Sequence, residues 1–261
     1  MSRQVVGLLT DFGTRDHYVS SMKGVLLKAV PDVQLIDISH EIAPGDITEA
    51  GWVLNAAWRD LPEGSVVVCV VDPGVGSERR GIAIQAHGRR GVGPDNGTLE
   101  LVARGSTDGE AVELTVRALW RHPVSPTFHG RDIFAPIAAR LATGAALREV
   151  GDAIDSIVPY PIRPPQRRPD GSAAGHVVHV DRFGNVVTDI GKELVPRGSV
   201  TVGVGSVVVG RLVSFYAEAD ADELVAVINS SGHLELAMRG ARAIDRLNVK
   251  RGAVVEVLPA R

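Results

Sequence analysis

The sequence predicts an α/β protein in two parts: an N-terminal layered α/β domain with a mainly parallel sheet, and a smaller C-terminal all-β, barrel-like domain. Up to about residue 158, short β-branched runs alternate with longer amphipathic stretches, as in βαβ units. A stretch rich in proline and arginine follows at 159–175, and only short strand-like runs come after it. We therefore expect domains at 1–158 and 176–261, joined by an exposed linker.

The elements of the N-terminal part can be assigned in order. VVGLLT (5–10) and VQLIDI (33–38) read as strands, and each is followed by a stretch with apolar residues at helical spacing, at 18–30 and 47–61. SVVVCVVD (65–72) is a continuous apolar run, which is typical of a strand buried on both faces in the middle of a parallel sheet. Right-handed crossovers between parallel strands would then place the helices on the faces of the sheet.

The C-terminal part has a different sequence pattern, because its apolar runs are short and are separated by turn residues. This pattern favours short strands of a small barrel or sandwich. The runs are HVVHVDRFGNVVTDI (176–190), SVTVGVGSVVVGRLVSFY (199–216), ELVAVIN (223–229), HLELAM (233–238) and AVVEVL (253–258).

Composition excludes several classes of protein. A formal net charge of -3 gives no general attraction to nucleic acid or to an anionic membrane. No apolar run reaches the roughly 18 residues needed to span a bilayer, and MSRQVVGLLTDFG resembles neither a signal nor a transit peptide. Cys69 is the sole cysteine and lies in an expected strand, so it reads as a core residue. We expect a cytoplasmic protein without intrachain disulfides.

Four polar segments are candidates for chemistry. Asp11 and Asp72 end two predicted strands, and ligands of open α/β sheets collect at that edge. His129, in TFHGRD, precedes the apolar helix-like segment IFAPIAARLA, and Asn96 lies in the polar turn PDNG. Each has a simpler reading: a strand-end aspartate often caps the next element, a loop histidine is often a surface residue, and PDNG is a common turn. The histidines form no metal-binding pattern, so no metal is assigned.

Several motifs together resemble, in order and spacing, the SAM hydroxide adenosyltransferases, which are adenosine-forming S-adenosyl-L-methionine (SAM) hydrolases related to the fluorinase and chlorinase. DPGVGSERR and TFHGRD are the most specific pair, and the match runs from about residue 6 to the C-terminus. The motifs are TDFGTRDHYVSSMKG, IDISHEIAPGDITEA, VVDPGVGSERR, VGPDNG, SPTFHGRDIFAPIAARLATG, HVDRFGNVVTDI and VINSSGHLELA.

The resemblance implies hydrolysis of SAM to adenosine and L-methionine without a cofactor. It also implies a homotrimer that binds neither nucleic acid nor membrane, with SAM between the N-terminal domain of one chain and the C-terminal domain of its neighbour. Asp72, Arg79 and His129 match the residues assigned to the nucleophilic water. Arg80 could exchange roles with Arg79. The halide-using relatives have a tyrosine at the position of Asp72 and no histidine at that of His129.

The resemblance also implies a set of substrate contacts. Asp11 matches the acid that holds the ribose hydroxyls, and Tyr216, or Phe215 beside it, matches the aromatic residue on the adenine. Asp16, Asp181, Asn185 and Ser230 match positions around the methionine or the adenosine. The full substrate-binding set is Asp11, Asp16, Asn96, Phe128, Asp181, Asn185, Tyr216, Ser230 and Ser231. Ser231 replaces an arginine of the fluorinase and Gly45 replaces a tryptophan, so no side-chain role is carried over at 231 and one pocket wall differs.

These residue types suit an in-line displacement by water at the ribose C5′. The sulfonium leaves as a neutral thioether and needs no acid, so the demand falls on orienting the nucleophile. Asp72 can accept a proton from the water, His129 can accept another hydrogen bond or the proton itself, and Arg79 can fix Asp72. Asp16 and Asp181 suit the methionine ammonium. The alternatives are a halide-using adenosyltransferase and a non-catalytic SAM or adenosine sensor.

Overall fold

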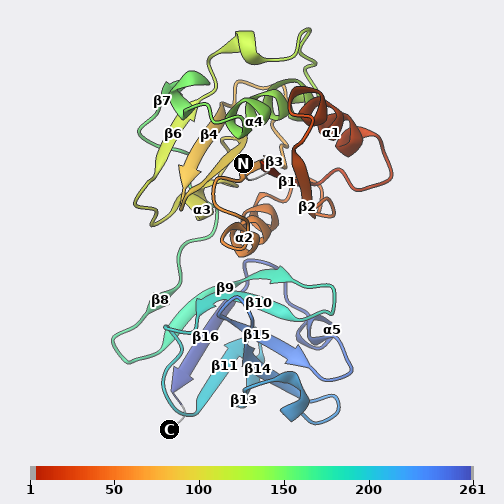
Figure 1. The fold of residues 1–261 in the computed structure, drawn as a ribbon. Helices are drawn as coiled ribbons and strands as arrows, with labels where there is room; N and C mark the ends of the chain where they lie inside the picture. Colours follow the sequence, from red (N-terminus) through yellow and green to blue (C-terminus); the bar gives the residue numbers. More distant parts are fainter. Residues whose placement is uncertain (1–3, 260–261) are drawn as a thin grey trace. The chain divides into compact units, whose positions relative to one another are not determined.

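A computed structural model describes residues 4–259, which form two compact units that divide between Pro161 and Ile162. The first unit is a layered α/β structure and the second is built almost entirely of strands (Figure 1). The predicted fold class is confirmed. None of the helices within 4–259 is long and apolar enough to cross a membrane.

The first unit is organised around a seven-stranded sheet in the order β2-β1-β3-β5-β4-β6-β7. Strands β2, β1, β3 and β5 are parallel, and β4, β6 and β7 extend the sheet in antiparallel fashion. The strands are β1 Val5–Thr10, β2 Gln34–Ser39, β3 Val66–Val70, β4 Gly81–Ala86, β5 Arg89–Pro94, β6 Glu110–Glu113 and β7 Asp152–Ala153. The α-helices are α1 Tyr18–Ala29, α2 Ile47–Trp58, α3 Glu100–Ala103 and α4 Ala135–Ala142.

Side-chain alternation along the central strands builds a core on each face of this sheet. Val6 and Leu8 of β1 join the core beneath α1 and α4, whereas Leu9 joins the core beneath α2. Figure 1 shows α1 and α4 on one side of the sheet and α2 on the other. Cys69 is fully buried in the core under α2, where burial raises the pKa of its thiol, so it stays protonated.

Helix α2 shows how the local sequence sets an element boundary. Asp46 is its N-cap, with a carboxylate that accepts a hydrogen bond from the Glu49 amide at 2.8 Å. The Glu49 carboxylate in turn accepts from the Ala43 amide at 3.0 Å, which fixes the chain entering the helix. This entry segment includes Gly45, which lies beside the candidate site.

The second unit contains a curled nine-stranded sheet whose strands run in the order β12-β11-β16-β9-β10-β15-β14-β13, with β8 paired to β9. All pairs are antiparallel except β13 with β14. Its core includes Val177, Val202 and Leu236. The elements are β8 Gln166–Arg167, β9 Ala173–Val180, β10 Val186–Gly191, β11 Val200–Val204, β12 Val207–Val209, β13 Leu212–Val213, β14 Leu224–Ile228, β15 His233–Met238, β16 Val254–Pro259 and helix α5 Ala243–Leu247.

The stretch 159–175, expected as an exposed linker, contains ordered contacts near its N-terminal end and in its middle. Tyr160 is buried and its hydroxyl donates to the Thr48 carbonyl at 2.8 Å. Strand β8 pairs with β9, and its two residues are exposed.

Candidate active site

The loop that follows β3 presents an acid at the carboxyl edge of the parallel strands. Strand β3 ends at Val70, and Asp72 lies two residues beyond it. Gly76 has a φ of +80°, and a Cβ at this position would lie 2.5 Å from the Pro126 carbonyl oxygen. Only glycine therefore allows this loop to approach the loop that carries His129 so closely.

Asp72, Arg79 and His129 form one connected cluster. The Arg79 Nε donates to both Asp72 carboxylate oxygens, at 3.0 and 3.1 Å, and Nη2 donates to Oδ2. Nη2 also lies 2.7 Å from His129 Nδ1. The Asp72 side chain is 5% exposed and that of Arg79 is 13% exposed, so little solvent screens their ion pair. The guanidinium also lies over the Phe134 ring, 5.3 Å from its centroid.

This geometry assigns the tautomer of His129. A guanidinium has donors and no acceptor, so Nδ1 must accept the hydrogen bond from Arg79, and the ring proton belongs on Nε2. Burial first, and then the positive charge of Arg79, lower the pKa of His129 from its ordinary value of 6.5. His129 is therefore a neutral imidazole at neutral pH, with its Nε2–H as the group left to meet a ligand.

The backbone after His129 forms a single turn of π-helix, Gly130–Phe134, before α4 begins. Such turns are rare and occur often at functional sites. A Cβ on Gly130 would lie 3.1 Å from the Met22 sulfur and 3.3 Å from a Val70 methyl group. The absence of a side chain at 130 thus lets this turn pack tightly on α1 and β3.

A cavity of about 540 Å³ connects the cluster to Asp11. The Asp11 Oδ2 accepts a hydrogen bond from the Gly45 amide at 2.8 Å, which holds the carboxylate against the entry to α2. Phe128 packs edge-on against Phe12, with centroids 6.0 Å apart. The lining residues are Asp11, Phe12, Tyr18, Pro44, Gly45, Val70, Asp72, Pro73, Val75, Thr127, Phe128, His129 and Gly130.

Three other expected residues of this unit do not line the cavity. Asn96 donates from Nδ2 to the Val71 carbonyl at 2.8 Å, so it supports the backbone between the end of β3 and Asp72. Asp16 is exposed on the loop before α1. Arg80 donates from Nε to Asp95 at 2.9 Å, so it does not exchange roles with Arg79.

The expected residues of the second unit gather in part around another cavity, of about 600 Å³. Asp181 accepts from the amide and the side chain of Asn185, both at 2.9 Å, and both residues line this cavity together with Tyr216. Of the two residues expected at the adenine, Tyr216 lines this cavity and Phe215 does not. Ser230 and Ser231 are exposed and lie outside its lining.

The second cavity has features that the sequence did not reveal. Phe183 lines it with 76% of its surface exposed. The sequence signal that could have identified Phe183 is a large aromatic residue in the polar turn DRFGN, where no burial is expected. The Tyr216 hydroxyl donates to the buried Glu235 carboxylate at 2.8 Å. Burial raises the pKa of Glu235, and burial together with this bond raises the pKa of Tyr216.

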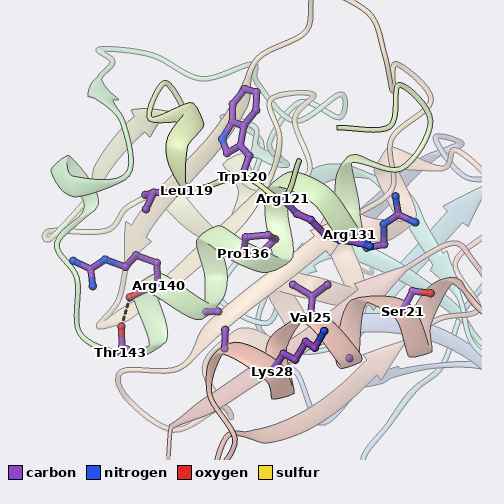
Figure 2. Close-up of a pocket in the computed structure, with 13 residues that line it drawn as sticks. Ser21, Val25, Lys28, Leu119, Trp120, Arg121, Arg131, Pro136, Arg140 and Thr143 are labelled. Atoms are coloured by element: carbon purple, nitrogen blue, oxygen red, sulfur yellow. Dashed lines mark hydrogen bonds between the residues drawn. The ribbon is translucent and has the colours of Figure 1, made fainter. Parts of the chain in front are cut away.

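A larger groove, of about 1060 Å³, lies between α1 and α4 (Figure 2). Its rim is basic, but Arg131 and Arg121 pair with Asp132, and Arg140 pairs with Glu149. No nucleophile and base meet there among its lining residues. Across 4–259, no group of three or more histidine, cysteine or acidic side chains is arranged to hold a metal ion.

Sequence comparisons match both units to one family. The SAM hydroxide adenosyltransferase N-terminal domain matches residues 6–151, and the C-terminal domain of the same family matches residues 175–256. The chain is 39% identical to an (R)-S-adenosyl-L-methionine hydrolase of Salinispora tropica, over 95% of each chain. It is 38% identical to one from Thermus thermophilus, over 97% of this chain and 99% of the relative.

More distant relatives and a solved structure agree with this match. The chain is 29% identical to a fluorinase of Nocardia brasiliensis, over 98% of this chain and 97% of the relative. An uncharacterized conserved protein from Thermotoga maritima superimposes with a TM-score of 0.91 at 36% identity, covering 97% of this chain and all of that one. The chain belongs to the SAM hydroxide adenosyltransferase family.

Proposed function

We propose that this protein hydrolyses SAM to adenosine and L-methionine by in-line attack of water on the ribose C5′. The observation that carries the proposal is the cluster in which Arg79 joins Asp72 to His129, two residues that line a cavity large enough for a nucleoside. The names of the relatives at 38–39% identity support the same reaction. No cofactor is needed, since a sulfonium is already a good leaving group.

Asp72 is the proton acceptor in this mechanism. A carboxylate has about four lone-pair positions, and Arg79 occupies three of them, so one remains for a water molecule. The water oxygen bonds to C5′, the C5′–S bond breaks, and its electron pair stays on sulfur as the thioether of methionine. One water proton passes to Asp72 and then to solvent, while the other becomes the 5′-hydroxyl proton of adenosine.

His129 orients the water in this mechanism and does not take its proton. Nδ1 is occupied by Arg79, and Nε2 carries a hydrogen, so the ring has no free lone pair with which to act as a base. Its Nε2–H can donate to the water oxygen. The second oxygen lone pair then points at C5′, which is the alignment that an in-line displacement requires.

We further propose that the active protein is a homotrimer in which each site combines residues of two copies. The water-handling cluster and Asp11 lie in the first unit, whereas Asp181, Asn185 and Tyr216 lie in the second. Phe183 in the second-unit cavity is largely exposed, and its ring could bury apolar surface against a ligand or a partner. Asp11 would hold the ribose, and Asp181 would bind the methionine ammonium.

The reaction itself is tested by incubating the protein with SAM in heavy-oxygen water, with and without chloride, and analysing the products by mass spectrometry. We expect adenosine that carries one heavy oxygen, together with methionine, and no change on adding chloride. A 5′-chloro nucleoside would instead place the protein with the halide-using relatives. Bound but intact SAM would indicate a sensor.

Adjacent arginines provide a matched test of the cluster. Arg79→Lys keeps the charge but cannot bond Asp72 through two nitrogens while also reaching His129, so we expect kcat to fall by about 10²- to 10³-fold. Arg80→Lys weakens the contacts with Asp95 and with the Ser156 carbonyl, neither of which belongs to the cluster, and should leave kcat within about threefold. Steady-state kinetics on both variants decide the point, and equal losses would contradict the role given to Arg79.

The pH dependence tests the neutral state of His129. Its pKa is lowered, so the imidazole is neutral above that value, and protonation on Nδ1 would set a proton against the Arg79 guanidinium. We expect kcat/KM to be level around pH 7 and to fall with acidification only below 6.5, the ordinary value for histidine. In His129→Gln that acid limb should be absent, with kcat lowered by about 10- to 100-fold. A rate that rises on acidification would mean that a charged imidazole is required.

The shared site is tested by mixing two defective proteins after dissociation and reassembly. Asp72→Ala removes the proton acceptor from the first unit, and Asp181→Asn removes a ligand charge from the second. If each site joins units of neighbouring copies, an equal mixture should regain about a quarter of wild-type activity, because half of the copies supply each intact unit at random. Activity that stays at the average of the two parents would show that each chain builds its own site.

A further inference from the structure

The loop that carries His129 is tied to one buried carboxylate, that of Asp132. Asp132 is 0% exposed, and its Oδ2 accepts a hydrogen bond from the Ser125 amide at 2.9 Å. Its main-chain carbonyl accepts from the Arg121 amide at 2.8 Å. The chain from 121 to 132 is therefore held at two points by a single residue, and His129 lies within the held segment.

Asp132 is also connected to the wall of the cavity through Arg131. The Arg131 Nε and Nη2 donate to the two carboxylate oxygens of Asp132, each at 2.7 Å, a bidentate pair with fixed geometry. The same guanidinium lies 4.8 Å from the centroid of the Phe128 ring. Phe128 in turn meets Tyr18 edge-to-face, with centroids 5.3 Å apart, on the lining of the cavity that holds Asp72.

The charge on Asp132 is stable in this setting. Burial alone would raise its pKa, but hydrogen bonds from Arg131 and from the Ser125 amide outweigh burial and hold the pKa of Asp132 below its ordinary value. The carboxylate is therefore ionised at neutral pH and can accept from all of its donors at once.

We propose that Asp132 is a positioning residue for the reaction proposed above, which holds His129 through the 121–132 loop and Phe128 through Arg131. Asp132 is not in the lining of the cavity, so it acts through these two residues and does not touch substrate. The proposal rests on the proposed function. The attack of water on C5′ is sensitive to the positions of these residues, because a displacement of about 1 Å at a reacting group can cost about 100-fold in rate.

The test compares Asp132→Asn with Arg121→Gln. Asparagine keeps the volume, but in either orientation its NH₂ would face a donor of Arg131, and in one of them it would also face the Ser125 amide, so the side chain loses hydrogen bonds that the carboxylate accepts. Arg121→Gln is the control, since Arg121 lies beside Arg131 at the same groove (Figure 2) but reaches Asp132 only at 3.4 Å from a half-exposed position. We expect Asp132→Asn to lower kcat by about 10- to 100-fold with KM changed less than about threefold, and Arg121→Gln to leave both near wild type.

A second measurement separates positioning from stability and from the reaction itself. Nitrogen NMR of the histidine rings reports whether His129 keeps its hydrogen on Nε2. We expect this form in the wild type and in Arg121→Gln, and a mixture of tautomers in Asp132→Asn because the contact with Arg79 is lost. If the wild type releases no adenosine from SAM, the proposed function fails, yet the ring spectrum still shows whether Asp132 places His129.

Two results would overturn the proposal. One is a folded Asp132→Asn protein with wild-type kcat and an unchanged His129 ring spectrum. If Asp132→Asn does not fold, Arg131→Lys is used instead, because it changes the more exposed partner of the Arg131–Asp132 pair. It keeps the charge but loses the bidentate hydrogen bonds. Arg131→Lys should lower kcat by about tenfold and mix the tautomers. Wild-type behaviour of Arg131→Lys in both measurements is the other overturning result.

Discussion

One nitrogen atom, Nη2 of Arg79, connects the two groups that would handle the attacking water. It has two hydrogens, of which one meets the Asp72 carboxylate and the other meets Nδ1 of His129. Because both hydrogens are used, the orientation of the carboxylate and the tautomer of the imidazole are set together. A lysine at this place would offer the charge without the planar fork that holds two different partners in fixed directions.

The rest of the first unit serves to bring these loops to one place. Asp72 follows a strand in the middle of the sheet, and His129 precedes a helix packed on one face of it. Two glycines make the approach possible: Gly76 lies against the Pro126 carbonyl, and Gly130 lies against β3 and α1. A larger side chain at either position would push the two loops apart, so the distance between Asp72 and His129 depends on residues that do no chemistry.

The layered fold could be predicted from the sequence because its strands leave local signals, and the strand-end acids could be named as candidates for the same reason, whereas the role expected of Arg79 came from the family resemblance. Short apolar runs rich in β-branched residues identified β1 and β3, and the strand-end rule placed Asp11 and Asp72 at one edge. The sequence favoured Arg79 but left Arg80 as an alternative, because the directions of adjacent side chains are fixed only once the loop is folded. Asn96 likewise matched a substrate contact, but its side chain is engaged by the Val71 carbonyl, which no spacing rule reveals.

Two other features that the sequence did not reveal have a similar cause. Phe183 has an exposed ring and lines one cavity with Asp181 and Tyr216. This cavity is formed by segments of the second unit that are far apart in the sequence. The hydrogen-bonding state of His129 depends on which atom of Arg79 reaches it. Such information exists only in three-dimensional contacts.

The charges of the cluster fit a cationic substrate and a neutral nucleophile. Asp72 and Arg79 cancel each other, and burial with Arg79 keeps His129 uncharged, so the cluster adds no net positive charge near a sulfonium. A protonated His129 would oppose both Arg79 and the substrate. A halide at the position of the water would lie against the Asp72 carboxylate, and the two negative charges would repel each other in a site with little solvent to screen them. Water carries no charge and can donate to the carboxylate, so the arrangement that activates water is also the one that disfavours halide.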